Sequence, residues 1–158
     1  MHKISPCLWF DGNAEEAANF YASVFKGARI TETMRHTESS PGPAGSVLAV
    51  LFELEGEEFM ALNAGPEFKF TPAISMFIKC DTQAEIDHYW DKLMDGGESM
   101  ACGWLTDRFG VTWQIAPRRL LKMLQDPDPV KADRTMKAMM GMIKLDIAAL
   151  DRAYDGQA

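Results

Sequence analysis

Two stretches decide the fold: KISPCLWFDGNAEEAANFY at residues 3–21 and AISMFIKCDTQAEIDHYW at residues 73–90. Each begins with an apolar run long enough for a β-strand. Each continues with a residue that can cap a helix, Asn13 or Thr82, and these two lie 69 positions apart. Apolar residues then recur at helical spacing, with an aromatic pair seven and eight positions after the cap. We therefore interpret the chain as an internal repeat of a strand and a helix.

Segments typical of strands follow each predicted helix. In the first half they are residues 28–37, 46–55 and 57–64, and in the second half residues 98–101, 103–108 and 111–116. The sequence therefore predicts an α+β fold with two βαβββ modules, residues 1–65 and 72–117. We expect one domain over residues 1–158, in which the modules form curved mixed sheets around a cup, plus C-terminal helices.

The tail, residues 118–158, differs from the modules. Helical spacing predicts helices over 129–143 and 147–154, with Pro129 in the first turn of one and Asp146 as the cap of the other. The tail carries several methionines, which usually fill gaps in apolar cores. We expect them to pack against the sheet or a second subunit, and not to hold a cofactor.

Composition excludes some function classes. The formal net charge is -7 and no segment is rich in Lys and Arg, which argues against nucleic-acid binding. No apolar stretch reaches the roughly 20 residues of a membrane span, so no membrane partner is expected. The N-terminal residues lack the features of a signal peptide. Three distant cysteines, Cys7, Cys80 and Cys102, favour reduced thiols, and we expect a cytoplasmic protein.

Four segments together resemble a known family: ISPCLWFDGNAEEAANFY, FKFTPAISMFIKCDTQAEIDHYW, CGWLTDRFGVTWQIAP and MIKLDIAALDRAY. They look like the PhnB-like branch of the vicinal-oxygen-chelate superfamily, which includes glyoxalase I, bleomycin-resistance proteins and extradiol dioxygenases. The segment at residues 107–114 is the most specific. The resemblance implies paired βαβββ modules around a cup, and a homodimer.

Many sequences of this branch carry the label 3-demethylubiquinone-9 3-methyltransferase. A typical methyltransferase cradles S-adenosylmethionine with a glycine-rich turn after its first strand. Here that strand ends in Phe10-Asp11-Gly12-Asn13, with one glycine, which does not make a nucleotide-binding loop. We therefore disfavour methyl transfer.

Metal-dependent members of the superfamily place His or carboxylate ligands on the first and last strands of each module. The matching positions here are Pro6 or Ser5, Asn63, Ser75 and Gln114. Neutral hydroxyls and amides alone are poor ligands for zinc, nickel or iron. We expect no catalytic metal and no cofactor. A site that includes His2, His36 or Cys7 remains the alternative.

Strand alternation predicts which side chains line the cup. If Ser75 faces inward then Phe77 does too, while Gln114 shares a face with Thr112 and Trp113 lies on the other face. The alternative is that large side chains fill the cup completely and leave no room for a ligand. The candidate pocket residues are Leu8, Phe10, Met60, Asn63, Phe70, Ser75, Phe77, Trp104 and Gln114, with Leu62 as a further candidate.

These features predict a small-molecule-binding protein of the glyoxalase/bleomycin-resistance type, without a catalytic metal and with an unidentified ligand. The alternatives are a metal-dependent lyase, isomerase or dioxygenase, and the methyltransferase of the label. No residue is predicted to be catalytic, and whether the protein is an enzyme stays open.

Overall fold

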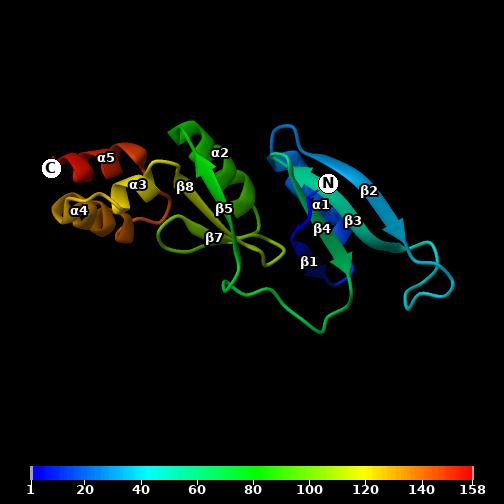
Figure 1. The fold of residues 1–158 in the computed structure, drawn as a ribbon. Helices are drawn as coiled ribbons and strands as arrows, with labels where there is room; N and C mark the ends of the chain where they lie inside the picture. The colour runs from blue at the N-terminus through cyan, green and yellow to red at the C-terminus, as the bar shows by residue number, and fades with distance from the viewer. Residues whose placement is uncertain (1, 158) are drawn as a thin grey trace. The chain divides into compact units, whose positions relative to one another are not determined.

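The computed structural model describes residues 2–157, and the chain divides into two compact units, Met1–Phe70 and Thr71–Ala158 (Figure 1). Each unit contains one four-stranded sheet of mixed direction with a helix on one face. The repeat of a βαβββ module is therefore confirmed, together with the α+β fold class. That the modules and the tail form one domain stays a prediction.

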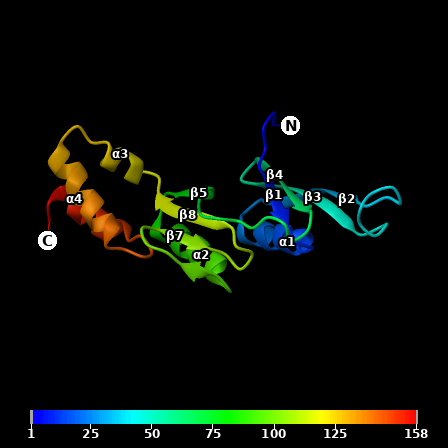
Figure 2. The same ribbon diagram turned by 90° about the horizontal axis from the view of Figure 1, so that it is seen from below.

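The first unit has the strand order β1-β4-β3-β2, in which β1 and β4 are parallel and the other pairs antiparallel. The helix α1 packs against β3 and β4 (Figure 2). Tyr21 stacks on Phe52 with ring centroids 6.1 Å apart. The hairpin between β3 and β4 turns at Glu55-Gly56, both at positive φ. The elements are β1 (Cys7–Phe10), α1 (Ala14–Val24), β2 (Arg29–Arg35), β3 (Val47–Leu54) and β4 (Glu57–Asn63).

The second unit repeats this arrangement with the strand order β5-β8-β7-β6, in which β5 and β8 are parallel. The helix α2 packs against β8, β7 and β5. Trp113 and Ile115 of β8 and Leu105 of β7 are buried in this core. The elements are β5 (Ser75–Cys80), α2 (Gln83–Met94), β6 (Glu98–Ser99), β7 (Trp104–Thr106) and β8 (Thr112–Pro117).

The two module helices begin in different ways. Thr82 caps α2 as predicted, because its hydroxyl accepts the Glu85 N–H at 3.2 Å. The prediction that Asn13 caps α1 with its side chain is wrong, since that side chain makes no capping hydrogen bond. Asn63 of β4 accepts the N–H of Ala14 at 2.9 Å instead. A residue distant in sequence thus satisfies the first turn of α1.

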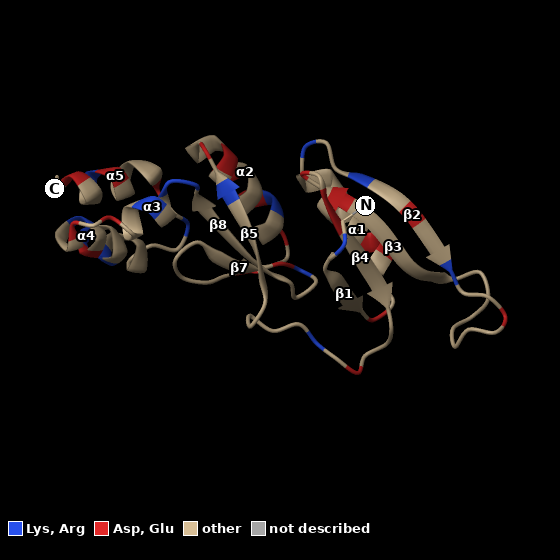
Figure 3. Cartoon of the chain, in the orientation of Figure 1, with Lys and Arg blue, Asp and Glu red and all other residues tan. Residues whose placement is uncertain are grey.

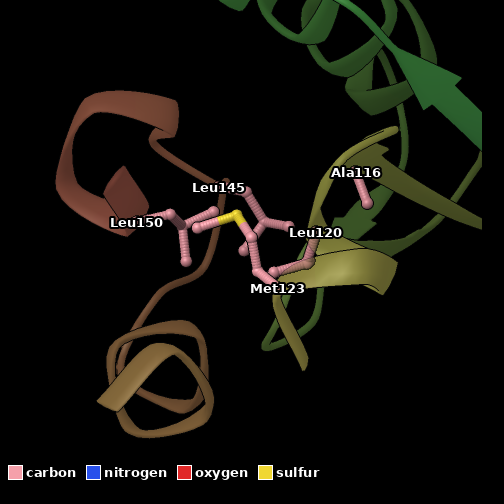
Figure 4. Packing of buried hydrophobic residues seen from close by; sticks show 5 residues of the cluster. All are labelled: Ala116, Leu120, Met123, Leu145 and Leu150. Carbon is pink, nitrogen blue, oxygen red and sulfur yellow. The ribbon is translucent and has the colours of Figure 1, made fainter. Parts of the chain in front are cut away.

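The tail adds α3 (Leu120–Leu124), α4 (Pro129–Met140) and α5 (Ile147–Asp155) to the second unit. The sequence did not predict α3, and α4 ends three residues earlier than expected because the chain turns at Gly141. Asp146 caps α5 as predicted, through the N–H of Ala149 at 3.0 Å. Five buried residues join the tail to the end of β8 (Figure 4): Ala116, Leu120, Met123, Leu145 and Leu150.

Hydrogen bonds also attach the tail to the module. Between α4 and α5, the carbonyls of Met142 and Ile143 accept the N–H groups of Cys102 and Gly103 at 2.8 and 2.7 Å. The Gln83 side chain bonds both Leu145 O and Ile147 N. The tail is therefore part of the second unit's core, and its methionines Met123, Met139 and Met142 help to fill that core.

A carboxylate–phenol pair inside the tail makes its stability depend on pH. The Tyr154 hydroxyl donates to Asp126, which lowers the pKa of that carboxyl and raises the pKa of the phenol. The stabilisation from Asp126 is present above its unfolded pKa of about 3.9 and is lost as pH falls through its lower folded value. The stabilisation from Tyr154 is present below its unfolded pKa of about 10 and is lost as pH rises through its higher folded value.

We therefore expect Tyr154→Phe to lower the urea midpoint at pH 6, and the difference from the unaltered protein to shrink at pH 2.5. Urea unfolding at both pH values measures this difference. An equal difference at both would contradict a charge-assisted hydrogen bond.

Charged residues are distributed over both units, and Lys and Arg do not gather on one element (Figure 3). Within residues 2–157, no helix is long and apolar enough to span a bilayer.

Candidate functional site

The sheet of the second unit has one face against α2 and one open face. The register pairs Ser75 with Thr112 and Phe77 with Gln114, and on the other side of β8 it pairs Gln114 with Trp104. These five side chains therefore share a face. The face against α2 carries Trp113 and Ile115 of β8, both buried, as strand alternation predicted for Trp113.

Asp107 determines which side chains of β8 point toward α2 and which point to the open face. It is 4% exposed, and its Oδ2 accepts the indole N–H of Trp113 at 2.9 Å. Its Oδ1 accepts the backbone N–H groups of Phe109 and Val111 at 2.8 and 3.0 Å, which closes the turn before β8. One carboxylate thus holds both the turn and the buried indole, so Gln114 is directed to the open face.

The polar centre of the open face is a hydrogen-bonded pair. Gln114 Nε2 donates to Ser75 Oγ at 2.8 Å. This bond uses one of the two amide protons, so Gln114 keeps a proton and its carbonyl oxygen for a ligand. Phe77 and Trp104 are its direct neighbours on the two adjacent strands. Phe77 is 36% exposed, and the other three are partly buried. The arrangement is an uncharged donor–acceptor pair between two aromatic rings.

Thr112 adds a buried hydroxyl to the same face. The residue is 1% exposed, and its Oγ1 has no hydrogen-bond partner among the described residues.

We expect Thr112→Val to leave stability unchanged or to raise it by up to about 1 kcal/mol, because no native bond is lost. Thr135→Val is the matched control: Thr135 is equally buried but donates to Lys131 O at 2.9 Å, so it should lose about 1 kcal/mol. Urea unfolding distinguishes them, and a clear loss for Thr112→Val would contradict the unpaired hydroxyl.

In the first unit, three of the predicted pocket residues face the helix. Leu8 pairs with Ala61 and Phe10 with Asn63, so these side chains lie on the face that packs on α1. Leu8 and Phe10 are 6% and 3% exposed. Asn63 uses Oδ1 on Ala14 N and Nδ2 on Val47 O. All three belong to the core and not to the open face.

Met60 and Leu62 lie on the opposite, open face of that sheet, with Cys7 and Trp9. The Trp9 indole donates to Gly65 O at 2.8 Å and packs edge-on against Phe68 at 4.9 Å. Sequence reasoning did not single out Trp9 for this face. Its strict alternation with Leu8 was the available signal, once Leu8 was assigned to the core.

Phe70 does not join these residues. Its ring packs edge-on against Phe10, with centroids 5.3 Å apart, so it is associated with a core residue. Of the nine predicted pocket residues, the structure brings four together on one open face, Ser75, Phe77, Trp104 and Gln114, and places Met60 on the open face of the other sheet.

A sequence profile of the family described as 3-demethylubiquinone-9 3-methyltransferase matches residues 2–116. The chain belongs to this family. A solved structure from Bacillus cereus, described as a putative 3-demethylubiquinone-9 3-methyltransferase, PhnB protein, is 39% identical with a TM-score of 0.66. The match covers 72% of this chain and 98% of that one. The part of the chain that the family profile matches ends before the tail.

More distant structures share the fold. A protein from Pseudomonas aeruginosa is 24% identical over 74% of this chain and 98% of its own, with a TM-score of 0.62. The fosfomycin resistance protein FosX from Listeria monocytogenes is 12% identical over 73% and 93%, with a TM-score of 0.50. These likenesses show that the fold is shared with both proteins. None of the curated proteins compared with the chain matches it.

The two modules can be superposed by their strand pairing. Phe10 pairs with Asn63 as Cys80 pairs with Pro117, so counting back three residues makes Met60 the equivalent of Gln114. Counting back five residues from Phe10 and Cys80 makes Ser5, and not Pro6, the equivalent of Ser75. The first strands of the two modules, β1 and β5, are thus offset by 70 positions and the helix caps by 69, because module one has one more residue between strand and cap, in the turn at Gly12, where φ is +84°.

The residues at the positions that the resemblance assigns to metal ligands are therefore Ser5, Met60, Ser75 and Gln114, with Met60 in place of the expected Asn63. This set contains no His or carboxylate, so these residues do not fit a zinc, nickel or iron centre. Within residues 2–157, no three His, Cys, Asp or Glu side chains are grouped so as to hold a metal ion. His2 bonds Gly56 O at 3.0 Å, and His36 lies in the hairpin after β2.

Cys80 does not lie on the open face. It is 1% exposed on the helix side of β5, and burial raises the pKa of its thiol to about 12. The thiol is therefore protonated at neutral pH and unsuited to nucleophilic chemistry.

Proposed function

We propose that this PhnB-like chain is a small-molecule-binding protein that holds its ligand on the open face of the β5-β8-β7-β6 sheet, without a catalytic metal. The observation that carries the proposal is the Gln114–Ser75 hydrogen bond between Phe77 and Trp104. Ligand sites commonly combine aromatic walls with a few fixed polar groups.

The chemistry of this face indicates the class of ligand. Aromatic rings flank Gln114 on both neighbouring strands, which suits a planar aromatic group. The amide and hydroxyl groups can donate and accept, which suits a carbonyl, hydroxyl or ring nitrogen on the ligand. Lys79, two residues after Phe77 on β5, is exposed on the same face, so an anionic substituent could extend toward it.

A thermal-shift screen of small aromatic and heteroaromatic compounds tests this proposal. A ligand at 100 times its Kd stabilises the folded protein by about 2.7 kcal/mol, which is a shift of several degrees. We expect Gln114→Leu to weaken the best compound at least about tenfold, because a site built for hydrogen bonds loses its partner. Gln125→Leu, at the end of α3, is the matched control and should bind normally. The absence of any stabilising compound, or equal loss in both variants, would contradict the proposal.

Metal-dependent catalysis is the second candidate, favoured by membership of the superfamily. Metal content per chain, measured on protein purified without an affinity tag or chelator, distinguishes the two. We expect no stoichiometric zinc, nickel, iron or manganese. One equivalent of such an ion, lost on Gln114→Leu, would move the enzyme hypothesis to first place.

Methyl transfer is favoured only by the name of the family. Calorimetric titration with S-adenosylmethionine tests it, and we expect no heat of binding. Saturable heat would support the name.

We also propose that the protein is a cytoplasmic homodimer. Support comes from apolar side chains that the second unit leaves exposed, Val130 at 57% and Ile143 at 53% among them, and from three cysteines without disulfides. Light scattering at micromolar concentration should give twice the mass of one chain, and a monomer would contradict the dimer.

A further inference from the structure

A pair of sulfur atoms joins the β6–β7 loop to the tail. Cys102 Sγ lies 3.8 Å from Met140 Sδ, and Met140 is the last residue of α4. Cys102 is partly buried and Met140 is 63% exposed, so the pair is at the surface and open to solvent. Neither residue lies on the open face of the sheet, and nothing in the proposed function uses them.

The separation of the two sulfurs suits one metal ion. Metal–thiolate bonds are about 2.3 Å long, so two sulfurs 3.8 Å apart subtend an angle of about 110° at a shared ion. That angle lies near the tetrahedral value and close to trigonal geometry. The pair therefore needs little movement to become a chelate.

A second methionine of α4 lies about one helical turn before Met140. Met136 precedes Met140 by four residues on α4 and is 41% exposed, so the two side chains share one face with Cβ atoms about 5–6 Å apart. A thiolate with two thioethers is a soft donor set, which selects Cu(I) and similar ions over magnesium, calcium or manganese.

The backbone holds the thiol in position. The Cys102 N–H donates to Met142 O at 2.8 Å, and the next N–H, of Gly103, donates to Ile143 O at 2.7 Å. The loop is thus tied to the two residues that follow the end of α4 and its turn. This pre-organisation means that binding an ion would order few additional groups.

We propose that Cys102, Met140 and Met136 form a binding site for a soft monovalent metal ion of the Cu(I) class. On binding, the Cys102 thiol loses its proton to solvent and the thiolate sulfur forms the bond to the ion, with no change in oxidation state. The bound ion clamps the β6–β7 loop to α4.

Competition for Cu(I) tests the site on the full chain, reduced and without oxygen, with bicinchoninate as the coloured competitor. We expect the protein to remove one equivalent of Cu(I) from the competitor. The double variant Cys102→Ser, Met140→Leu should bind at least about tenfold more weakly. Circular dichroism confirms that the variants are folded.

The matched control is Cys7→Ser with Met34→Leu. Cys7 is exposed, and Met34 at 42% is as exposed as Met136, but both lie on strands of the other unit. The control should bind Cu(I) as the unaltered chain does, and so should Gln114→Leu, which separates this site from the proposed ligand face. No uptake by the unaltered chain, or equal uptake by the double variant, would overturn the proposal.

Discussion

Asp107→Ala should destabilise the protein by about 3 kcal/mol or more, because it removes the acceptor of three hydrogen bonds in a buried site. The indole N–H of Trp113, a residue 2% exposed, would lose its partner, and so would the N–H of Val111. Urea unfolding measures the loss through the midpoint, provided that the slope is unchanged.

Asp107→Asn separates the two functions of the carboxylate. The carbonyl oxygen of the substituted side chain can still accept the N–H groups of Phe109 and Val111. Its amide NH2 group would face the indole N–H of Trp113, and because both groups are donors, no hydrogen bond can form there. We expect an intermediate loss. Asp95→Ala is the control, since that carboxylate is 78% exposed and forms a surface ion pair with Arg108, so the change should stay within about 0.5 kcal/mol. Equal losses at Asp107 and Asp95 would contradict this account of the turn.

Gly103→Ala should be the second strongly destabilising change. A Cβ at this position would lie 2.7 Å from Ile115 O and 2.9 Å from Leu145 Cγ, so it would press β7 away from both β8 and the tail. Its φ of +82° is also unfavourable for alanine, at about 1–2 kcal/mol. Overpacking adds about 1–3 kcal/mol to that backbone cost.

Gly56→Ala isolates the steric part of this effect. Gly56 has the same φ of +82°, but a Cβ there meets nothing within 4 Å. We expect Gly103→Ala to exceed Gly56→Ala by about 2 kcal/mol in urea unfolding and to expose the tail to limited proteolysis. Similar losses in both variants would show that the tail does not pack closely on Gly103.

The repeated module could be predicted because its signals are local. The side chains of Thr82 and Asp146 cap their helices by accepting the backbone N–H three residues further on, and Pro129 begins α4 as expected. The cap of α1 could not be predicted, because Asn63 acts from 49 positions away. The short helix α3 was missed since its five residues carry too little periodicity.

The strand faces of the candidate residues could be predicted in one module and not in the other for a similar reason. Alternation alone groups Ser75 with Phe77 and Gln114 with Thr112, and the resemblance to the superfamily places Ser75 and Gln114 together. In module one, the extra residue at Gly12 shifts β1 by one position relative to the helix, and a shift of one exchanges the faces of a strand. Leu8 and Phe10 therefore entered the core, and Cys7 and Trp9 the open face.

The most direct test of ligand binding is the response of two indole N–H signals and one side-chain amide in a nitrogen–proton correlation spectrum. Trp104 and Gln114 lie on the open face, whereas Trp113 lies on the other face of the same sheet, bonded to Asp107. Titration with the best compound of the thermal-shift screen should move the signals of Trp104 Nε1–H and Gln114 Nε2–H and leave Trp113 Nε1–H in place. Unchanged Gln114 and Trp104 signals at saturation would contradict a ligand site on this face.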